Sequence, residues 1–142
     1  SNPFRRGTQL NNKAINSFAE EGKENYEIAA PSIDHVTVNL SGGNLQKVEL
    51  ARESGSDPAV LLANQPTRGL DVGVIEYVHQ QFVDLRSIGV GILLFSEDLD
   101  EIFTLSECIA VILQGEILGL FYAEEAELEK IGLLMAGVRD GA

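Results

Sequence analysis

Apolar positions follow two spacings along this chain, and together they predict alternating helices and strands. A spacing of three to four residues predicts helices over 11–22, 41–53 and 72–86. Two short apolar runs, 58–64 and 90–95, are typical of strands buried in a parallel sheet. The apolar face of the third helix consists of Val72, Ile75, Val78, Phe82 and Leu85.

The C-terminal part has a different pattern. The runs "CIAVIL" and "EILGLF" flank Gln114-Gly115, which predicts an antiparallel hairpin with a tight two-residue turn. Before the hairpin we expect a helix over 96–106, with Ser96 as its N-cap. After the hairpin we expect a helix over 124–136, whose first turn is acidic as the helix dipole favours. This order of strands and helices along the chain predicts an α/β fold of mostly parallel strands that ends in a hairpin.

The remaining segments carry weaker signals. Residues 1–10 are polar and are expected to be loose, while "HVTVNL" at 35–40 suggests an extended stretch within a loop. Asn11 or Asn12 is the expected N-cap of the first helix, and Gly22 its expected end.

Composition narrows the function classes. The 142 residues are 44% hydrophobic, which predicts one soluble globular domain. Ten basic against 22 acidic residues give a formal charge of −12, which argues against nucleic acid or an anionic membrane as a direct partner. Neither a signal peptide nor an apolar run long enough to span a membrane is present, so an intracellular location is expected.

Metal and disulfide chemistry have little support. The single cysteine, Cys108, excludes an intrachain disulfide, and its place in "CIAVIL" predicts a small buried hydrophobic residue. His35 and His79 are too isolated to indicate a zinc site, and His79 beside an apolar helix face is expected to pack. No metal site is predicted.

A serine-glycine-glycine turn at the start of the second helix is the best candidate for chemistry. Ser41 offers a hydroxyl, Gly42 and Gly43 permit close backbone approach, and the helix start carries about half a positive charge. These are properties of an anion-binding helix start. However, the chain contains no G-x-x-x-x-G-K-[ST] loop to hold the α- and β-phosphates of a nucleotide.

Four stretches carry a resemblance to a known family: "LSGGNLQKVELARE", "QPTRGLDVG", "FSEDLDEIF" and "IAVILQGEILG". They resemble the C-terminal half of the second nucleotide-binding domain of ABC importers for sugars and nucleosides, whose two ATPase domains are fused. The resemblance covers roughly residues 38–136. It implies a partial P-loop NTPase fold of the ABC type without the phosphate-loop strand, and a chain that is part of a longer polypeptide.

Two segments follow from this resemblance. Residues 1–37 are expected to be a remnant of the helical subdomain and linker, and residues 38–142 the C-terminal half of the ATPase core. Without the phosphate-loop strand, the strands at 58–64 and 90–95 are expected either to pair directly or to expose edges that invite self-association.

The resemblance also assigns site residues. In the family, the signature loop reaches across a dimer and presses on the γ-phosphate of ATP held by the partner domain. The matching positions here are Leu40, Ser41, Gly42, Gly43, Asn44 and Gln46. Asp71 matches the D-loop along the dimer seam, and it is also a natural N-cap for helix 72–86; both roles are compatible.

Three departures from the family pattern concern hydrolysis. Where the family has a magnesium-organising Asp and a catalytic Glu, this chain has Asn64 and Gln65, and Gln cannot act as a general base near pH 7. Glu97 occupies the position of a phosphate-contacting histidine, where a carboxylate repels phosphate. No catalytic residue is therefore expected, and the chain alone is expected to be inactive as an ATPase.

The leading hypothesis is a binding and coupling part of an importer ATPase. The implied cofactors are ATP and Mg²⁺ in the full-length protein, with none for this chain alone. The implied partners are the first ATPase domain of the same polypeptide and the membrane permease subunits, at the cytoplasmic face of the membrane. One alternative is a regulatory module from a non-transport ABC protein of translation or DNA repair; a free-standing enzyme is disfavoured by the missing phosphate loop.

Overall fold

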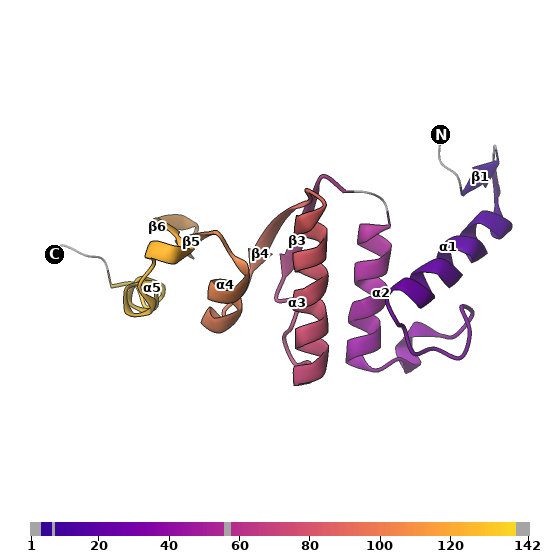
Figure 1. Ribbon diagram of the computed structural model, residues 1–142, viewed down its shortest axis with the longest axis horizontal. Helices are drawn as coiled ribbons and strands as arrows, with labels where there is room; N and C mark the ends of the chain where they lie inside the picture. Colours follow the sequence, from indigo (N-terminus) through magenta and orange to yellow (C-terminus); the bar gives the residue numbers. More distant parts are fainter. Residues whose placement is uncertain (1–3, 7, 56–57, 139–142) are drawn as a thin grey trace. The chain divides into compact units, whose positions relative to one another are not determined.

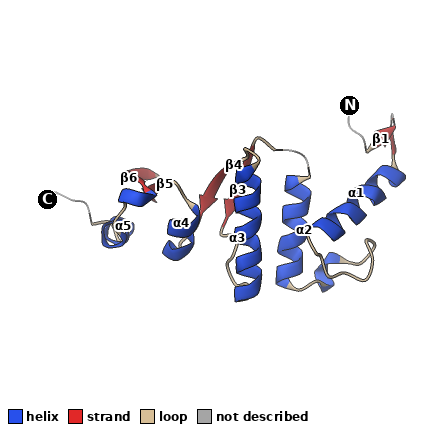
Figure 2. Ribbon diagram, viewed as in Figure 1, coloured by secondary structure: helices blue, strands red, loops and turns tan. Residues whose placement is uncertain are grey.

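The computed structural model describes residues 4–6, 8–55 and 58–138. Figures 1 and 2 show the order of the helices and strands, which confirms the α/β class. The helices are α1 (Asn12–Asn25), α2 (Gly42–Ser54), α3 (Val72–Ser87), α4 (Leu99–Leu105) and α5 (Leu128–Met135), with 3₁₀ turns η1 (Thr37–Asn39) and η2 (Ala123–Glu125). The strands are β1 (Arg5–Arg6), β2 (Gln9–Leu10), β3 (Val60–Asn64), β4 (Gly91–Phe95), β5 (Cys108–Leu113) and β6 (Glu116–Tyr122).

The chain divides into two compact units. The first takes the chain up to Leu62 together with Pro66–Leu93, and the second takes Ala63–Gln65 and the chain from Leu94 onward. Strands β3 and β4 therefore contribute residues to both units. The predicted segment boundary after residue 37 concerns the longer polypeptide and stays a prediction.

Helices α1, α2 and α3 make up most of the first unit, with α2 in contact with both others (Figure 1). Val78, Phe82 and Leu85 of α3 are buried, as its apolar spacing predicts, whereas Val72 at its first turn is exposed. The face presented to the core therefore begins one turn later than the sequence pattern indicates.

The N-terminal segment differs from expectation at three places. Asn11 caps α1, with its side chain accepting from the Ala14 amide, but the helix continues past Gly22. A Cβ at Gly22 would lie 3.6 Å from the Cβ of Ala51, an ordinary contact distance, so α1 continues through this glycine beside α2. The loose ends expected in residues 1–10 are wrong for β1 and β2, which pair antiparallel, and the extended stretch expected at 35–40 contains the turn η1.

Strands β3 and β4 pair directly, one of the two outcomes expected for a sheet without its phosphate-loop strand. The Gly91 amide donates to the Ala59 carbonyl at one end (3.0 Å), and the Gln65 amide to the Phe95 carbonyl at the other (2.8 Å). Equivalent ends are thus paired, so the strands run parallel. The prediction that both faces are buried is wrong, because residues of β3 alternate: Leu61 is buried and Leu62 is 64% exposed.

The second unit is built on the predicted hairpin. Gln114 and Gly115 have φ values of 52° and 85°, the left-handed pair that a tight type I′ turn requires. The core beneath the hairpin consists of Ile109, Val111, Ile131 and Leu134, with Leu99, Ile102, Phe103, Leu118 and Phe121 packed against it. The helix predicted over 124–136 is shorter, because η2 takes the first residues and α5 begins at Leu128.

The opposite face of the hairpin is apolar and exposed. Its cross-strand pairs are Cys108 with Tyr122, Ala110 with Leu120 and Ile112 with Ile117. Exposed fractions reach 69% at Leu120. The expected burial of Cys108 is therefore wrong, since alternation along β5 directs Ile109, not Cys108, to the core. We call these six residues the outer hairpin face.

The N-cap of α4 is Asp98, which corrects the expected cap at Ser96. The carboxylate of Asp98 accepts from the amides of Asp100 (2.9 Å) and Glu101 (3.3 Å). Ser96 instead accepts from the Asp98 amide and so holds the cap residue in place. Across residues 4–6, 8–55 and 58–138, the structure contains no helix of the length and apolar character needed to cross a lipid bilayer.

Candidate functional site

Ser41 is the N-cap of α2, which begins at the serine-glycine-glycine turn as the sequence predicts. Its hydroxyl oxygen accepts from the Asn44 amide (3.4 Å) and from the Asn44 side-chain nitrogen (3.0 Å), and its carbonyl accepts from Leu45 (2.9 Å). A serine hydroxyl has two acceptor positions and one donor hydrogen. With both acceptor positions engaged by Asn44, the exposed hydroxyl retains its hydrogen for an outside acceptor.

The two glycines after Ser41 differ in how much room the structure leaves for a side chain. A Cβ at Gly43 would lie 2.8 Å and 3.1 Å from the two γ-methyls of Val74, so α2 and α3 approach too closely there for any side chain. A Cβ at Gly42 would meet only Leu70, at 3.7 Å, and Gly42 is exposed. Close approach to a ligand was the sequence-based reason for both; for Gly43, helix packing is sufficient.

The start of α2 is electrostatically suited to an anion. The first-turn amides of a helix, here including Gly42 and Gly43, have no acceptor within the helix. Aligned peptide dipoles along Gly42–Ser54 add about half a positive charge at this end. Leu40, at the end of η1, and Gln46, in α2, are both half-buried beside this turn in sequence. The local chemistry therefore matches the sequence prediction.

Asn44 connects the turn to a distant segment, a contact that no sequence pattern indicates. Its side-chain oxygen accepts from the Ala29 amide at 2.7 Å, while its side-chain nitrogen donates to Ser41. Both ends of this carboxamide are thus engaged within the chain. The contact joins residues 15 positions apart that belong to no common periodic segment.

Lys47 makes a second connection from α2 to the same segment. Its ammonium donates to the Glu27 carbonyl (3.2 Å) and lies 4.2 Å from the centroid of the Tyr77 ring in α3. The pKa of Tyr77 is raised to about 12, first because burial disfavours the phenolate, and further because Glu27 and Tyr26 lie nearby. A favourable cation–π contact with the neutral ring is consistent with this protonated state.

The D-loop candidate is a turn between β3 and α3. Gly69 adopts φ 74°, the Leu70 amide donates to the Thr67 carbonyl, and Leu70 lies beside Gly42. Asp71 occupies the N-cap position of α3, but its side chain makes no capping hydrogen bond, which corrects the expected cap. Its exposed carboxylate can therefore favour the helix start only through its charge beside the helix dipole.

The ends of β3 and β4 bring the other candidates near each other in the second unit. Gln65, with φ 51°, donates its amide to Phe95, two residues before Glu97. Asn64 and Glu97 are exposed, and Gln65 is half-buried. The two neutral amides, Asn64 and Gln65, cannot act as a general base, and the Glu97 carboxylate brings no positive charge to a phosphate.

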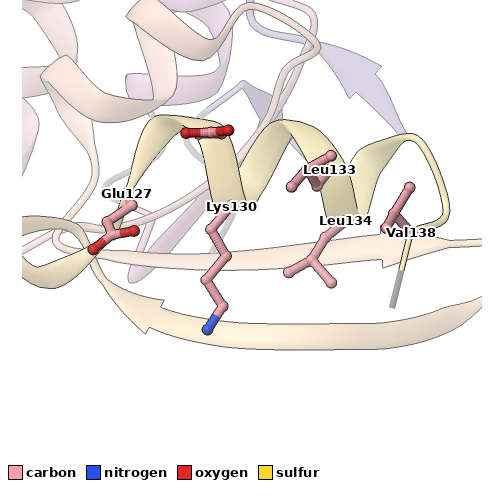
Figure 3. A pocket seen from close by; sticks show the side chains of 6 residues that line it. Glu127, Lys130, Leu133, Leu134 and Val138 are labelled. Atoms are coloured by element: carbon pink, nitrogen blue, oxygen red, sulfur yellow. The ribbon is translucent and has the colours of Figure 1, made fainter. Parts of the chain in front are cut away.

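A surface hollow of about 290 Å³ lies along α5, away in sequence from every predicted site residue (Figure 3). It is lined by Glu127, Glu129, Lys130, Leu133, Leu134 and Val138. Two carboxylates and three apolar side chains surround the one cation of this lining, Lys130, so the hollow does not favour an anion and is not the candidate site (Figure 3).

Curated proteins similar to this chain are import ATP-binding proteins. The glucose import ATP-binding protein of Haloferax volcanii is 44% identical over 139 residues, which cover 96% of this chain. The nucleoside import ATP-binding protein of Lactococcus lactis is 41% identical over 128 residues, and the guanosine import ATP-binding protein of Bacillus subtilis 45% over 112. The chain spans about a quarter of the length of these relatives. No family model matches it.

Solved structures give the same fold. An inward-facing metal-chelate type ABC transporter matches 96% of this chain and 53% of its own, with a TM-score of 0.75 at 14% identity. An ATP-binding cassette solved as a dimer with ADP and phosphate matches 84% of this chain and 51% of its own, with a TM-score of 0.68 at 25% identity.

Proposed function

Because the chain is a homologue of sugar and nucleoside import ATP-binding proteins and has the ABC-type ATPase fold, we propose that it is part of the ATP-binding subunit of such an importer. Its role there is to supply the signature loop to ATP held by a partner ATPase domain. The observation that carries the proposal is the exposed start of α2, where Ser41 is fixed as the N-cap with its hydroxyl hydrogen still available.

The chemistry of the α2 start supports binding to a terminal phosphate. The Ser41 hydroxyl and the first-turn amides of Gly42 and Gly43 are hydrogen-bond donors, and the helix dipole favours negative charge beside them. Donors held in advance stabilise developing phosphate charge without reorganisation. The 142 residues contain no lysine-bearing phosphate loop, so the proposal assigns the grip on the nucleotide to another domain.

The chain's own strand ends support a site that does not hydrolyse ATP. Gln65 has no basicity near pH 7, and the exposed carboxylate of Glu97 disfavours a phosphate placed beside it. Asn64 brings no charge to a magnesium ion. Hydrolysis is therefore assigned to the partner's site, where this chain contributes the α2 start and Asp71 lies along the seam.

Membrane permease subunits and the first ATPase domain of the same polypeptide are the partners we propose, at the cytoplasmic face of the membrane. The non-transport alternative is less well supported, because the similar curated proteins are named for import. Those names favour a sugar or a nucleoside as the transported solute.

The test is Ser41→Arg in the full-length protein reconstituted with its membrane partners. A bulky cation in place of the small hydroxyl blocks approach of the triphosphate, and loss of one preorganised donor alone lowers turnover about 100-fold. We expect ATP hydrolysis and solute uptake to fall together by at least that factor. Ser32→Arg, at an exposed serine outside α2, is the matched control and should retain activity. Wild-type uptake in Ser41→Arg would refute the signature role.

A further inference from the structure

One carboxamide, that of Asn44, is bonded at both ends. Its nitrogen donates to the Ser41 hydroxyl oxygen at 3.0 Å, and its oxygen accepts from the Ala29 amide at 2.7 Å. The other bond to the Ser41 hydroxyl oxygen, from the Asn44 amide, is longer at 3.4 Å. The side chain of Asn44 thus makes the shorter of the two contacts that orient the hydroxyl.

The segment Tyr26–Ala30 is held in a defined conformation against α2. Glu27 adopts φ 49°, which is unusual for a residue with a side chain, and its carbonyl accepts from Lys47. The Ile28 amide donates back to the Lys23 carbonyl in the last turn of α1. The position of Ala29, and with it the Asn44 carboxamide, therefore depends on α1 and on Lys47. We call residues 26–30 the strap.

We propose that Asn44 is a positioning residue that orients the Ser41 hydroxyl toward bound phosphate and makes this orientation depend on the strap. This rests on the proposed function, since it assigns how the α2 start is prepared for the nucleotide. With both acceptor positions of the hydroxyl filled by Asn44, its hydrogen points outward. When the carboxamide is lost, one weak bond remains and the hydroxyl rotates among several directions.

Aspartate in place of Asn44 reverses the orientation. The aspartate side chain keeps an acceptor for the Ala29 amide, so the strap remains attached. It has no hydrogen to donate, and a carboxylate instead accepts the Ser41 hydroxyl hydrogen, which then points away from the phosphate. Asn44→Asp therefore separates attachment of the strap from orientation of the hydroxyl, and it guards against loss of folding in Asn44→Ala.

The experiment is a double-mutant cycle in the full-length protein with its membrane partners, with kcat and KM for ATP measured separately. We expect Ser41→Ala to lower kcat about 100-fold, as loss of one preorganised donor does. Asn44→Ala should lower kcat about fivefold, as one orienting hydrogen bond contributes such a factor. The double variant should match Ser41→Ala within about twofold, because Asn44 acts through the hydroxyl. Asn44→Asp should lower kcat at least as far as Asn44→Ala, and by less when Ser41 is already replaced by alanine. KM should change less than kcat throughout.

Controls and contrary outcomes separate the two proposals. Asn39→Ala, at an exposed asparagine in η1, should leave kcat unchanged, and thermal midpoints should show that each variant is folded. Unchanged hydrolysis in Ser41→Ala overturns the proposed function itself. The positioning role alone is overturned if Ser41→Ala lowers kcat while Asn44→Ala leaves kcat unchanged. It is also overturned if the effects of the two substitutions on kcat simply add in the double variant.

Discussion

Gly43→Ala is the most direct test of how α2 and α3 pack. The added methyl would lie 2.8 Å from one γ-methyl of Val74, 3.1 Å from the other and 3.5 Å from its Cβ. Valine in a helix is confined almost entirely to one χ1 rotamer, so it cannot rotate away easily. The helices must therefore move apart at the point where the candidate site begins.

The expected magnitude follows from two opposing effects. Overpacking a close contact destabilises by about 1–3 kcal/mol. Alanine favours a helix over glycine by up to about 1 kcal/mol, which offsets part of that loss. We therefore expect Gly43→Ala to lower the free energy of unfolding by about 1 kcal/mol net.

The chain provides a matched control in Gly73→Ala. Gly73 is the second residue of α3 as Gly43 is of α2, and nothing lies within 4 Å of the position that a Cβ would take there. This substitution should stabilise by about 0.5–1 kcal/mol. Urea unfolding followed by circular dichroism in the far ultraviolet measures both. Equal effects in the two variants would refute the steric account, whereas recovery in Gly43→Ala/Val74→Ala would support it.

Two further predictions concern groups outside that contact. The Tyr77 hydroxyl is buried and has no hydrogen-bond partner among the described residues, so Tyr77→Phe should raise the free energy of unfolding by about 1 kcal/mol. Since the folded pKa of Tyr77 is raised from 10.0 to about 12, its ionisation leaves the free energy of unfolding unchanged below pH 10 and lowers it as pH rises toward 12, because the unfolded chain loses this proton first. Unfolding measured across that range should lack this fall in Tyr77→Phe, and an identical pH profile would contradict it. Asp98→Ala should destabilise α4 by about 1 kcal/mol in thermal unfolding and Asp98→Asn by less, because asparagine retains the capping oxygen; equal losses would count against the cap.

Elements with a local signal were predicted well from the sequence. The helix start at the Ser41-Gly42-Gly43 turn, the Gln114-Gly115 turn and the helix 72–86 depend on residues close in the chain, and the structure confirms all three. Short sequence stretches also indicated the family resemblance, and the similarity to import ATP-binding proteins confirms it. Local propensity and short motifs are therefore sufficient for the fold class.

Features that depend on distant contacts were missed. The Asn44–Ala29 and Lys47–Tyr77 contacts join segments with no shared pattern, so nothing in the sequence indicated them. The predicted burial of β3 and of Cys108 was too high, because a continuous apolar run does not indicate which face of a strand other elements cover. The roles of the signature, D-loop and strand-end residues remain predictions, to be tested by the Ser41 and Asn44 variants.

The outer hairpin face should determine how the solubility of the separate chain depends on salt. Mutual repulsion between copies carrying −12 each opposes contact between their bare apolar strands at low ionic strength. Added salt shortens the range of that repulsion to about 3 Å at 1 M, while sulfate strengthens apolar association. Ammonium sulfate should therefore precipitate the chain readily, and dilute buffer well above its pI of about 4.4 should keep it dispersed.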